Sequence, residues 1–487
     1  MNGLPLLSAL IGLPLLGALL LVLLPADRHA RGAALGLAIA ELGLALAVAG
    51  GVDSHAAGFQ LVEKMVWIPS LNAHYHLGID GLSALFLPLT ALLFVATTLA
   101  SWTGVRTMPR LYFALLLLLE GVTMGIFCAL DTLLFFLFWE LTLVPVYFLV
   151  SLWGVGPHRR YAAVKYTLMM LGGGVPLLFG FLLAAFRHAE PVFDLPTLLA
   201  QPLPAEAQLA VFLLLLVGFA VKTPVFPLHT WLPTIAMEGP AAVAAVMTGL
   251  KLGAYGMIRF AIPLAPQAAQ DLHWLLAGMG VVGILYGALA ALAQTNLRRL
   301  LAFSSISHVG MVLLGLSTFT IQGLQGAVFQ LLNFTIAAGG AFLIAGFVHH
   351  RIGSTDLAHL GGVASRMPMA ATFFLLLGLA GMGVPLTSGF AAEHLILLGT
   401  LASHKGAALA ALGGAILGAA YFLGFYRQAF LGPVRNVAVD DCLDLQPREL
   451  VIAVVLGLLV LAVGLYPAAV LDFTRGAAEG WMSGLGR

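Results

Sequence analysis

Five ionisable side chains and one histidine lie inside stretches of sequence that are otherwise apolar. They are Glu120, Glu140, Lys222, Lys251, His308 and Glu393. Glu140, for example, lies within FFLFWELTLVPVYFLVSLWG, which covers residues 135–154. A charge at the centre of a bilayer costs from about 3 to about 10 kcal/mol or more, so such residues are rare and usually functional. A series of carboxylates and amines in a region of low dielectric constant is what proton transfer requires.

Lysine suits proton transfer because its charge depends on its surroundings. Burial disfavours the charged amine and a nearby carboxylate favours it, so movement of the carboxylate could load or release a proton. A carboxylate and a lysine on two facing helices would form such a switch. Each residue could instead belong to a buried ion pair that only fixes helix packing. Five ionisable groups spread over separate apolar stretches favour proton transfer over that alternative.

The composition places these residues in a membrane protein. Of 487 residues, 61% are hydrophobic and 9% are charged, whereas soluble domains carry about 25% charged residues. The apolar stretches reach roughly 20 residues, the length of a membrane-spanning helix, and lack the alternation of barrel strands. We therefore expect an all-α polytopic membrane protein. The net charge of +1 indicates no nucleic-acid partner, and the start of the chain is interpreted as a retained first helix.

Hydropathy and loop residues predict about 14 transmembrane helices. The predicted spans are residues 4–25, 32–50, 79–101, 111–130, 132–154, 161–186, 207–222, 239–262, 272–294, 299–318, 323–348, 370–400, 405–427 and 449–470. The longest polar segments, residues 51–78 and 428–448, do not resemble soluble domains.

Basic residues concentrate in alternate loops. The odd-numbered loops contain Arg28, Arg31, Arg106, Arg110, Arg159, Arg160, Lys165, Arg298, Arg299, Arg351, Arg366, Arg427, Arg435 and Arg448. The even-numbered loops and the C-terminus contain Lys64, Arg187, Arg259, Lys405, Arg475 and Arg487. Since cytoplasmic loops are enriched in Lys and Arg, we expect a bacterial inner (cytoplasmic) membrane location with both termini on the periplasmic side.

Two predicted spans contain helix breakers. In VKTPVFPLHTWLP, Pro224, Pro227 and Pro233 cannot all lie in one regular helix. In GMGVPLTSGFAAEHL, Pro385 and its neighbouring glycines interrupt the twelfth span. Broken helices at membrane depth mark ion pathways, and a matched pair in two halves suggests inverted repeats. The alternative is a pair of ordinary kinks in a packed bundle.

Several of these stretches resemble the antiporter-like proton-translocating subunits of respiratory complex I (NADH:quinone oxidoreductase), most closely the M-type (chain 13) subunit. They are FFLFWELTLVPVYFLVSLWG, FAVKTPVFPLHTWLP, LKLGAYGMIRF, AQTNLRRLLAFSSISHVGMVLLG and SGFAAEHLILLG. The resemblance covers about residues 75–430 and implies 14 helices with two inverted five-helix repeats, helices 4–8 and 9–13, in which helices 7 and 12 are broken. The implied regions are residues 1–110 (helices 1–3), 111–262 (first repeat), 263–430 (second repeat) and 431–487 (C-terminal loop and helix 14).

The resemblance implies a role for each matching residue. Glu140 resembles the carboxylate that modulates the first half-channel, and Lys222 resembles the proton-carrying lysine on the broken helix. Lys251 resembles the central lysine between the two halves, and His308 the histidine of the connecting polar axis. Glu393 resembles the acid of the second broken helix, and a glutamate there favours the M-type subunit over its sisters.

Other residues fit the family less closely. Glu120 is a candidate mainly because of its depth, and His229 and Asn333 are further candidates on the polar axis. Asn333 occupies a position where the family usually has histidine, and an amide does not titrate near neutral pH. Thr234 and Ile235 replace the usual Asp-Ala pair.

These departures leave several functions open. The leading expectation is a proton-translocating membrane-arm subunit with two linked half-channels and a Glu/Lys/His relay. A subunit of a related assembly (an alternative complex I, a membrane hydrogenase or a multi-subunit cation/proton antiporter) and a scaffold subunit that has lost pumping are alternatives. An autonomous small-molecule transporter is the least favoured, because no substrate-shaped polar cluster is evident.

The sequence contains no redox motif. Cys128 and Cys442 are far apart and show no metal-binding or redox pattern, and there is no haem attachment motif or dinucleotide-binding glycine loop after a strand. We therefore expect no cofactor or metal in this chain, and NADH, FMN, Fe–S clusters and quinone on partner subunits. The expected partners are other membrane-arm subunits, with two sister antiporter-like subunits as neighbours, and the lipid bilayer.

Overall fold

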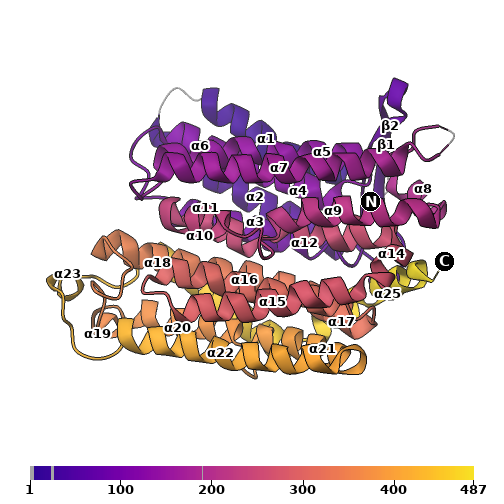
Figure 1. Ribbon diagram of the computed structural model, residues 1–487. Coiled ribbons are helices and arrows are strands. Elements are labelled where there is room, and N and C mark those ends of the chain that lie inside the picture. The colour runs from indigo at the N-terminus through magenta and orange to yellow at the C-terminus, as the bar shows by residue number, and fades with distance from the viewer. Residues whose placement is uncertain (1–4, 24–26, 189, 487) are drawn as a thin grey trace.

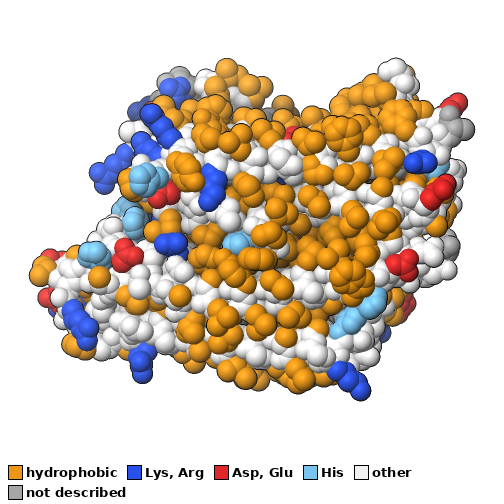
Figure 2. All heavy atoms as spheres, in the orientation of Figure 1, with side chains coloured by type: hydrophobic (Ala, Val, Ile, Leu, Met, Phe, Trp, Pro, Cys, Tyr) orange, Lys and Arg blue, Asp and Glu red, His pale blue; other side chains and the backbone are white. Residues whose placement is uncertain are grey.

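Long helices lie side by side, with the N-terminal half of the chain packed against the C-terminal half (Figure 1). The computed structural model describes residues 5–23, 27–188 and 190–486. The extreme termini and the ends of the first predicted span, at residues 4 and 24–25, therefore lie outside the described residues. Figure 2 shows an apolar belt across the middle of one face, with charged side chains gathered at its two ends. This distribution is typical of a protein that spans a bilayer.

The helices and strands follow one another along the chain. They are α1 (Leu6–Leu23), η1 (Asp27–His29), α2 (Ala30–Gly50), β1 (Gln60–Ile68), η2 (Pro69–Leu71), β2 (Ala73–Ile79), α3 (Phe86–Ala100), α4 (Pro109–Cys128), α5 (Thr132–Leu141), α6 (Leu143–Trp153), α7 (Arg159–Ala185), α8 (Leu195–Ala200), α9 (Ala205–Lys222), α10 (Trp231–Glu238), α11 (Ala241–Gly249), α12 (Leu252–Gly256), η3 (Met257–Ala261), α13 (Ile262–Leu264), α14 (Pro266–Asp271), α15 (His273–Leu292), α16 (Leu297–Leu316), α17 (Ile321–Asn333), η4 (Phe334–Ala338), α18 (Gly339–Ile352), α19 (Val363–Arg366), α20 (Pro368–Gly381), α21 (Ser388–Ser403), α22 (Lys405–Ala429), α23 (Val437–Asp440), α24 (Pro447–Leu465) and α25 (Ala468–Leu485).

The prediction of a polytopic helical membrane protein is confirmed. Within the described residues, 12 helical stretches are long and apolar enough to cross a membrane. The prediction was about 14. The two remaining predicted spans correspond to shorter apolar helices, α3 and α20. Helix α3 is short because a β-hairpin precedes it, and α20 is short because the chain breaks after Gly381.

The polar segment at residues 51–78 contains two strands, a local departure from the all-α expectation. Strands β1 and β2 form an antiparallel hairpin in which Lys64 pairs with His76 and Met65 with Tyr75. The strand sequence QLVEKMVWI contains the β-branched and aromatic residues that favour a strand. Asn72, with a φ of 52°, supplies the left-handed residue that precedes β2. The third span begins at Phe86 rather than at residue 79.

Both predicted helix interruptions are present. Helix α9 ends at Lys222 and α10 begins at Trp231, whose indole Nε1 donates across the break to the Val221 carbonyl at 2.8 Å. Helix α20 ends at Gly381 and α21 begins at Ser388. Each break leaves backbone groups without helical partners at membrane depth.

Further irregularities were not predicted. The fifth span changes from α5 to α6 at Thr142, and the eighth is interrupted between α11 and α12 at Leu250 and Lys251. Residues 257–261 and 334–338 form π-helical turns. Such turns often lie at functional sites, and all of these irregularities adjoin candidate residues or the helices that carry them.

Polar caps fix where several of the helices begin. The Asp131 carboxylate accepts hydrogen bonds from the Leu133 and Leu134 amides at 2.9 and 3.1 Å, at the start of α5. The Asn296 side chain caps α16 in the same way. A side-chain oxygen at this position satisfies amides that the helix leaves free, so these residues set the level of Glu140 and His308 along their helices.

Asp194 anchors the hairpin to the N-terminus of α8. Its carboxylate contacts His76 Nδ1 at 2.5 Å and Lys64 Nζ at 2.8 Å. Burial alone would raise the pKa of Asp194, but hydrogen bonds from His76, Lys64 and Thr197 outweigh burial and hold the pKa well below its ordinary value. An aspartate with a lowered pKa in the folded protein stabilises that protein above its ordinary pKa of about 3.9, and this contribution is lost as the pH falls through the lowered value.

Asp194→Asn is therefore expected to lower the thermal melting temperature of the purified protein by a nearly constant amount from about pH 8 to about pH 5. The penalty should shrink only below about pH 4, where the Asp194 carboxyl of the unfolded chain begins to take up a proton while that of the folded protein stays ionised. Melting curves of the two proteins across this range check the prediction. A penalty that vanishes by about pH 6 would show that the ionised carboxylate does not hold the hairpin.

Candidate functional site

Lys222 lies at the first helix break with its amine buried. It is the last residue of α9, and its side chain is held by the interrupted fifth span. The amine Nζ donates to the Trp139 carbonyl at 3.0 Å and to Thr142 Oγ1 at 2.7 Å. It also lies 3.9 Å from the centroid of the Trp139 ring, where the ring face attracts a cation. These neutral partners can hold the amine in either charge state.

Glu140 approaches Lys222 without pairing with it. Its carboxylate interacts electrostatically with Lys222, but no ion pair between the two is formed in the structure as described. Glu140 Oε1 is buried and has no hydrogen-bond partner among the described residues. The arrangement leaves room for the carboxylate to move toward the amine or away from it.

Glycines of α7 make the space for this pair. A Cβ atom on Gly174 would overlap Glu140 Oε1, and a Cβ on Gly173 would lie 2.8 Å from the Cβ of Val221. Val221 directly precedes Lys222. Small residues allow helices in membranes to approach closely, so these glycines let the carboxylate and the amine-bearing helix lie against the same turn of α7.

Sequence reasoning missed Tyr166 in this region. The side chain is completely buried, and its hydroxyl lies beside Thr142 and the Glu140 carboxylate. Its ring packs against that of Trp231, 5.3 Å between centroids. A tyrosine in an apolar span resembles an ordinary core residue, so no pattern in the sequence singles it out.

Lys251 occupies the break between α11 and α12, where it faces the second half of the molecule. Its side chain is 4% exposed, and Nζ lies 3.4 Å from the Met247 carbonyl. The amine is 5.5 Å from the centroid of the Phe334 ring, which in turn lies 6.0 Å from the His308 ring. Lys251 and His308 are therefore brought together around Phe334.

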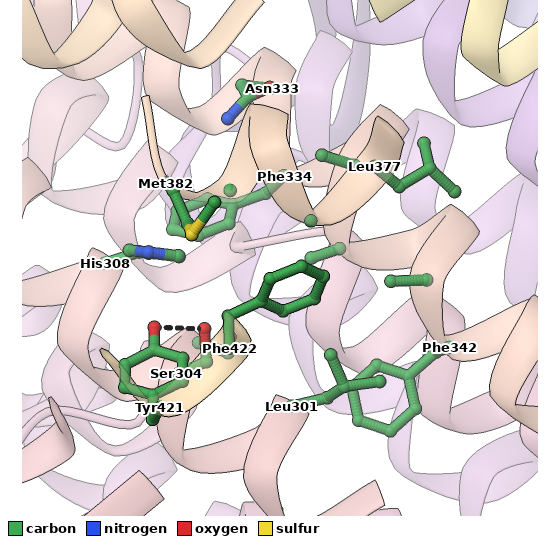
Figure 3. Close-up of a pocket in the computed structure, with 16 residues that line it drawn as sticks. Leu301, Ser304, His308, Asn333, Phe334, Phe342, Leu377, Met382, Tyr421 and Phe422 are labelled. Carbon is green, nitrogen blue, oxygen red and sulfur yellow. Dashed lines mark hydrogen bonds between the residues drawn. The ribbon is translucent and has the colours of Figure 1, made fainter. Parts of the chain in front are cut away.

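Two small cavities continue from His308. The first, of about 40 Å³, is lined by His308, Asn333, Ser304 and Tyr421 among others (Figure 3). In it the Ser304 and Tyr421 hydroxyls are 2.7 Å apart. The second, of about 20 Å³, is lined by both His308 and Glu393. A cavity needs about 10–15 Å³ to hold a water molecule, so water fits between the imidazole and the carboxylate.

Asn333 connects the two halves of the second broken helix. Its Oδ1 accepts a hydrogen bond from Ser388 Oγ at 2.7 Å, at the start of α21. Its Nδ2 lies 3.5 Å from the Ala380 carbonyl, near the end of α20. Glu393 fills the break itself, because a Cβ on Gly383, whose φ is +64°, would overlap the Glu393 carboxylate. The amide thus supports the segment that positions Glu393.

The remaining predicted residues lie outside this arrangement. His229, in the break between α9 and α10, has its Nε2 3.2 Å from the Tyr286 hydroxyl. Glu120 on α4 is completely buried, and it interacts electrostatically with Glu41 on α2, which is also completely buried. All four carboxylate oxygens of this pair lack hydrogen-bond partners within the described residues. Glu41 was missed although its surroundings, ALGLAIAELGLALAVAG, carry the same signal as those of Glu120.

Thr234, one of the departures from the family pattern, has a clear contact. Lys165 Nζ donates to Thr234 Oγ1 at 3.0 Å and to the Thr230 carbonyl at 2.8 Å. A neutral hydroxyl therefore accepts the hydrogen bond from this lysine.

Among the residues that the structure describes, no group of three or more His, Cys, Asp and Glu side chains is placed to hold a metal ion, and both cysteines are free thiols.

Comparisons with known proteins agree with the expected resemblance. The NAD(P)H-quinone oxidoreductase chain 4 1 of Synechococcus sp. (strain JA-3-3Ab) is 40% identical over 475 residues, which cover 95% of this chain and 90% of that protein. The NADH-quinone oxidoreductase subunit M of Rickettsia prowazekii (strain Madrid E) is 35% identical, covering 97% of each chain. A chain in the structure of respiratory complex I from Thermus thermophilus with bound NADH is 33% identical and superposes with a TM-score of 0.90 over 99% of both chains.

The family assignment rests on the region that contains most of the site. Residues 129–418 match the transmembrane family described as NADH:quinone oxidoreductase/Mrp antiporter. This range includes Glu140, both buried lysines, His308 and Glu393. The chain therefore belongs to the NADH:quinone oxidoreductase/Mrp antiporter transmembrane family.

Proposed function

We propose that this chain is a proton-translocating membrane-arm subunit of a complex I-like NADH:quinone oxidoreductase. The observation that carries the proposal is the burial of Lys222 and Lys251 at helix interruptions without ion-pair partners among the described residues. Buried amines of this kind can change charge when a nearby carboxylate moves. The names of the relatives, NADH-quinone oxidoreductase subunit M and NAD(P)H-quinone oxidoreductase chain 4 1, support the same function.

In the first half-channel, Glu140 controls the charge of Lys222. When the carboxylate moves toward the amine, the charged amine is favoured and takes up a proton. When the carboxylate moves away, the buried amine loses its counter-charge and releases the proton. The hydrogen bonds to Thr142 and the Trp139 carbonyl keep the amine in place during both steps.

In the second half-channel, the proton passes from Lys251 to His308 and then to Glu393. The contacts around Phe334 bring the first two residues together, and the cavity shared by His308 and Glu393 has room for the water that the last transfer needs. Asn333 cannot carry a proton because an amide does not titrate near neutral pH. In this scheme it positions the broken helix while the proton travels through His308.

The same proposal covers the partner subunits, the orientation of the chain in the membrane and its internal repeats. NADH, FMN, Fe–S clusters and quinone belong to partner subunits, and the neighbours are other membrane-arm subunits, including two sister antiporter-like subunits. The end rich in Arg faces the bacterial cytoplasm and both termini face the periplasm, as the bias of basic loops favours. The regions 111–262 and 263–430 form the two inverted repeats, each of which contains one of the breaks at residues 223–230 and 382–387.

A subunit of a multi-subunit cation/proton antiporter is the second candidate, since the family includes Mrp antiporters. Identities of 35–40% to relatives named as quinone oxidoreductase subunits favour the complex I-like assembly. A scaffold that no longer pumps is less favoured, because Glu140, both lysines and Glu393 are all retained. Identification of the subunits that co-purify with this chain separates the candidates.

Glu140→Gln is expected to reduce proton pumping to less than about a tenth of the wild-type value while the complex still assembles. Glutamine is of similar size, so it fits above Gly174, but it carries no charge to switch Lys222. Proton pumping should be measured beside quinone reductase activity in membrane vesicles that contain the assembled complex. Pumping close to wild type in the Gln variant would eliminate this role.

Lys222→Arg and Lys222→Ala together separate a proton carrier from a fixed charge. Arginine keeps the positive charge but does not release its proton in proteins, so both variants should lose pumping to a similar extent. The same pair of substitutions at Lys251 tests whether the two halves form one path. If arginine restored pumping where alanine abolished it, the lysines would serve only as fixed charges. Vesicle assays with normalised complex content provide the measurement.

Asn333→His is expected to retain at least about half of the pumping activity, because imidazole can form the same hydrogen bonds and can also titrate. Asn333→Leu should reduce it severalfold, since leucine removes the bond to Ser388 and makes the first cavity more apolar. Full activity in the leucine variant would show that neither the amide nor the water beside it takes part.

A further inference from the structure

A cavity of about 170 Å³ lies apart from the proton pathway, and none of the proposed pathway residues lines it. Its walls come from the loop between α3 and α4, from α6, from the N-terminal turns of α11, α16 and α24, and from the C-terminal end of α18. Thr103, Gly104 and His350 in its lining are exposed, so the cavity opens to the surface. The segments that form it belong to the Arg-rich end of the molecule.

Arg298 supplies a buried positive charge to this cavity. The residue is 2% exposed, and its Nη1 and Nη2 atoms donate to the Met237 and Gly239 carbonyls at 3.2 and 2.5 Å. Its Nε atom is buried without a hydrogen-bond partner, and no carboxylate in the described residues lies within ion-pair distance of it. A buried cation of this kind is costly unless a counter-charge approaches it.

Further unpartnered polar groups surround the same space. His349 lies close enough to Arg298 to interact with it electrostatically, and its Nδ1 is also buried and without a partner in the described chain. Helix α11 begins at the cavity after Pro240, with no side-chain cap within the described structure. The first amides of a helix lack helical acceptors, and Ala241 and Ala242, the first two residues of α11, both line the cavity.

Two more arginines reach the cavity wall. Arg31 Nη2 donates to the Val105 carbonyl at 2.8 Å, and Arg448 Nη2 donates to Thr103 Oγ1 at 2.8 Å. Val105 and Thr103 line the cavity. The Nε atoms of both arginines are buried and unpartnered as far as the described residues extend. Arg448 Nη2 also lies 3.9 Å from Glu449 Oε1, whereas Arg31 forms no ion pair with the described residues.

The carboxylates near the cavity are already occupied. Glu449, which lines it, pairs with Arg351 at 2.5 Å and accepts the Gln446 amide at 2.9 Å. Glu238, which interacts with Arg298 over a longer distance, accepts the His158 amide at 2.7 Å. The balance of charge around the cavity is positive, and the arginine Nε atoms and the first amides of α11 are free donors.

We propose that this cavity binds a phosphate group, either free inorganic phosphate or the headgroup of a phospholipid. Guanidinium groups and the free amides at a helix N-terminus are the donors that bind phosphate in proteins, and here they meet in one open cavity. The bound anion compensates Arg298 and lies at the positive end of the α11 dipole. Helix α11 ends at Gly249, two residues before Lys251, so the site would also fix the end of the helix that leads to the central lysine.

Gly104 allows a test that does not disturb the packing. A Cβ on this lining glycine would meet no described atom within 4 Å, so Gly104→Asp adds a negative charge and Gly104→Asn is its neutral match of the same size. Gly406, another position with open space, lies at the start of α22, and Gly406→Asp controls for added charge elsewhere. Arg298→Ala is unsuitable alone because Arg298 also holds the segment between α10 and α11.

The complex that contains each variant is purified from its native membranes. Binding of radiolabelled inorganic phosphate is measured by equilibrium dialysis, and retained phospholipid is counted by native mass spectrometry after stepwise delipidation. We expect Gly104→Asp to lower binding in one of these assays by at least about tenfold, with Gly104→Asn and Gly406→Asp close to wild type. Loss in the dialysis arm identifies free phosphate, and loss of a retained lipid identifies a headgroup.

Three results would overturn the proposal. One is that the wild-type complex binds no inorganic phosphate and that every phospholipid it retains is also retained by the Gly104→Asp variant. Another is an equal loss in Gly104→Asn, which would indicate a steric effect. The third is undiminished binding in Gly104→Asp. Quinone reductase activity and subunit content verify that each complex is assembled, so none of these results depends on whether the chain translocates protons.

Discussion

The cost of a charge in a medium of low dielectric constant governs the arrangement of this molecule. Lys222 and Lys251 are buried in the apolar interior, where a permanent, uncompensated ammonium would be unfavourable by several kcal/mol or more. Each amine is held by backbone carbonyls, a hydroxyl or an aromatic face. These partners tolerate both charge states, and in the proposed function the position of the Glu140 carboxylate decides which state of Lys222 is favoured.

Broken helices and glycines provide the space that this arrangement needs. A continuous helix satisfies all its interior backbone groups, whereas the breaks after Lys222 and around Lys251 expose carbonyls and admit side chains at membrane depth. Gly174 leaves room for Glu140, and Gly383 leaves room for Glu393. Asn333 binds across the second break. Each break therefore interrupts the helix locally and makes room for a buried ionisable side chain.

Most of the membrane architecture could be predicted because it depends on local properties of the sequence. Apolar length identified the spans, proline identified both interruptions, and a charge in an apolar stretch identified Glu140, Lys222 and Glu393. The hairpin at residues 60–79 was missed because a polar connecting segment has no strong pattern beside twenty-residue apolar helices. Glu41, by contrast, is as predictable as Glu120, since both are carboxylates within long apolar stretches.

Other features depend on tertiary contacts and could not be predicted. Tyr166 becomes a candidate only because it lies next to Thr142 and Glu140. The cavity between His308 and Glu393 forms from residues of several helices, and the structural role of Asn333 depends on Ser388 and Ala380. The cavity proposed to bind phosphate likewise depends on arginines from distant parts of the chain. None of these contacts is recorded by hydropathy or by the spacing of residues along one helix.

The central claim is that Glu140 moves relative to Lys222 and thereby sets the charge of the amine. Cryo-electron microscopy of the assembled complex during turnover tests this claim most directly, because it compares the separation of the two groups in several states of one sample. The account predicts at least two states, one with the carboxylate and the amine in ion-pair contact and one with them apart, as they are here. An unchanged separation in every state of the working complex would contradict it.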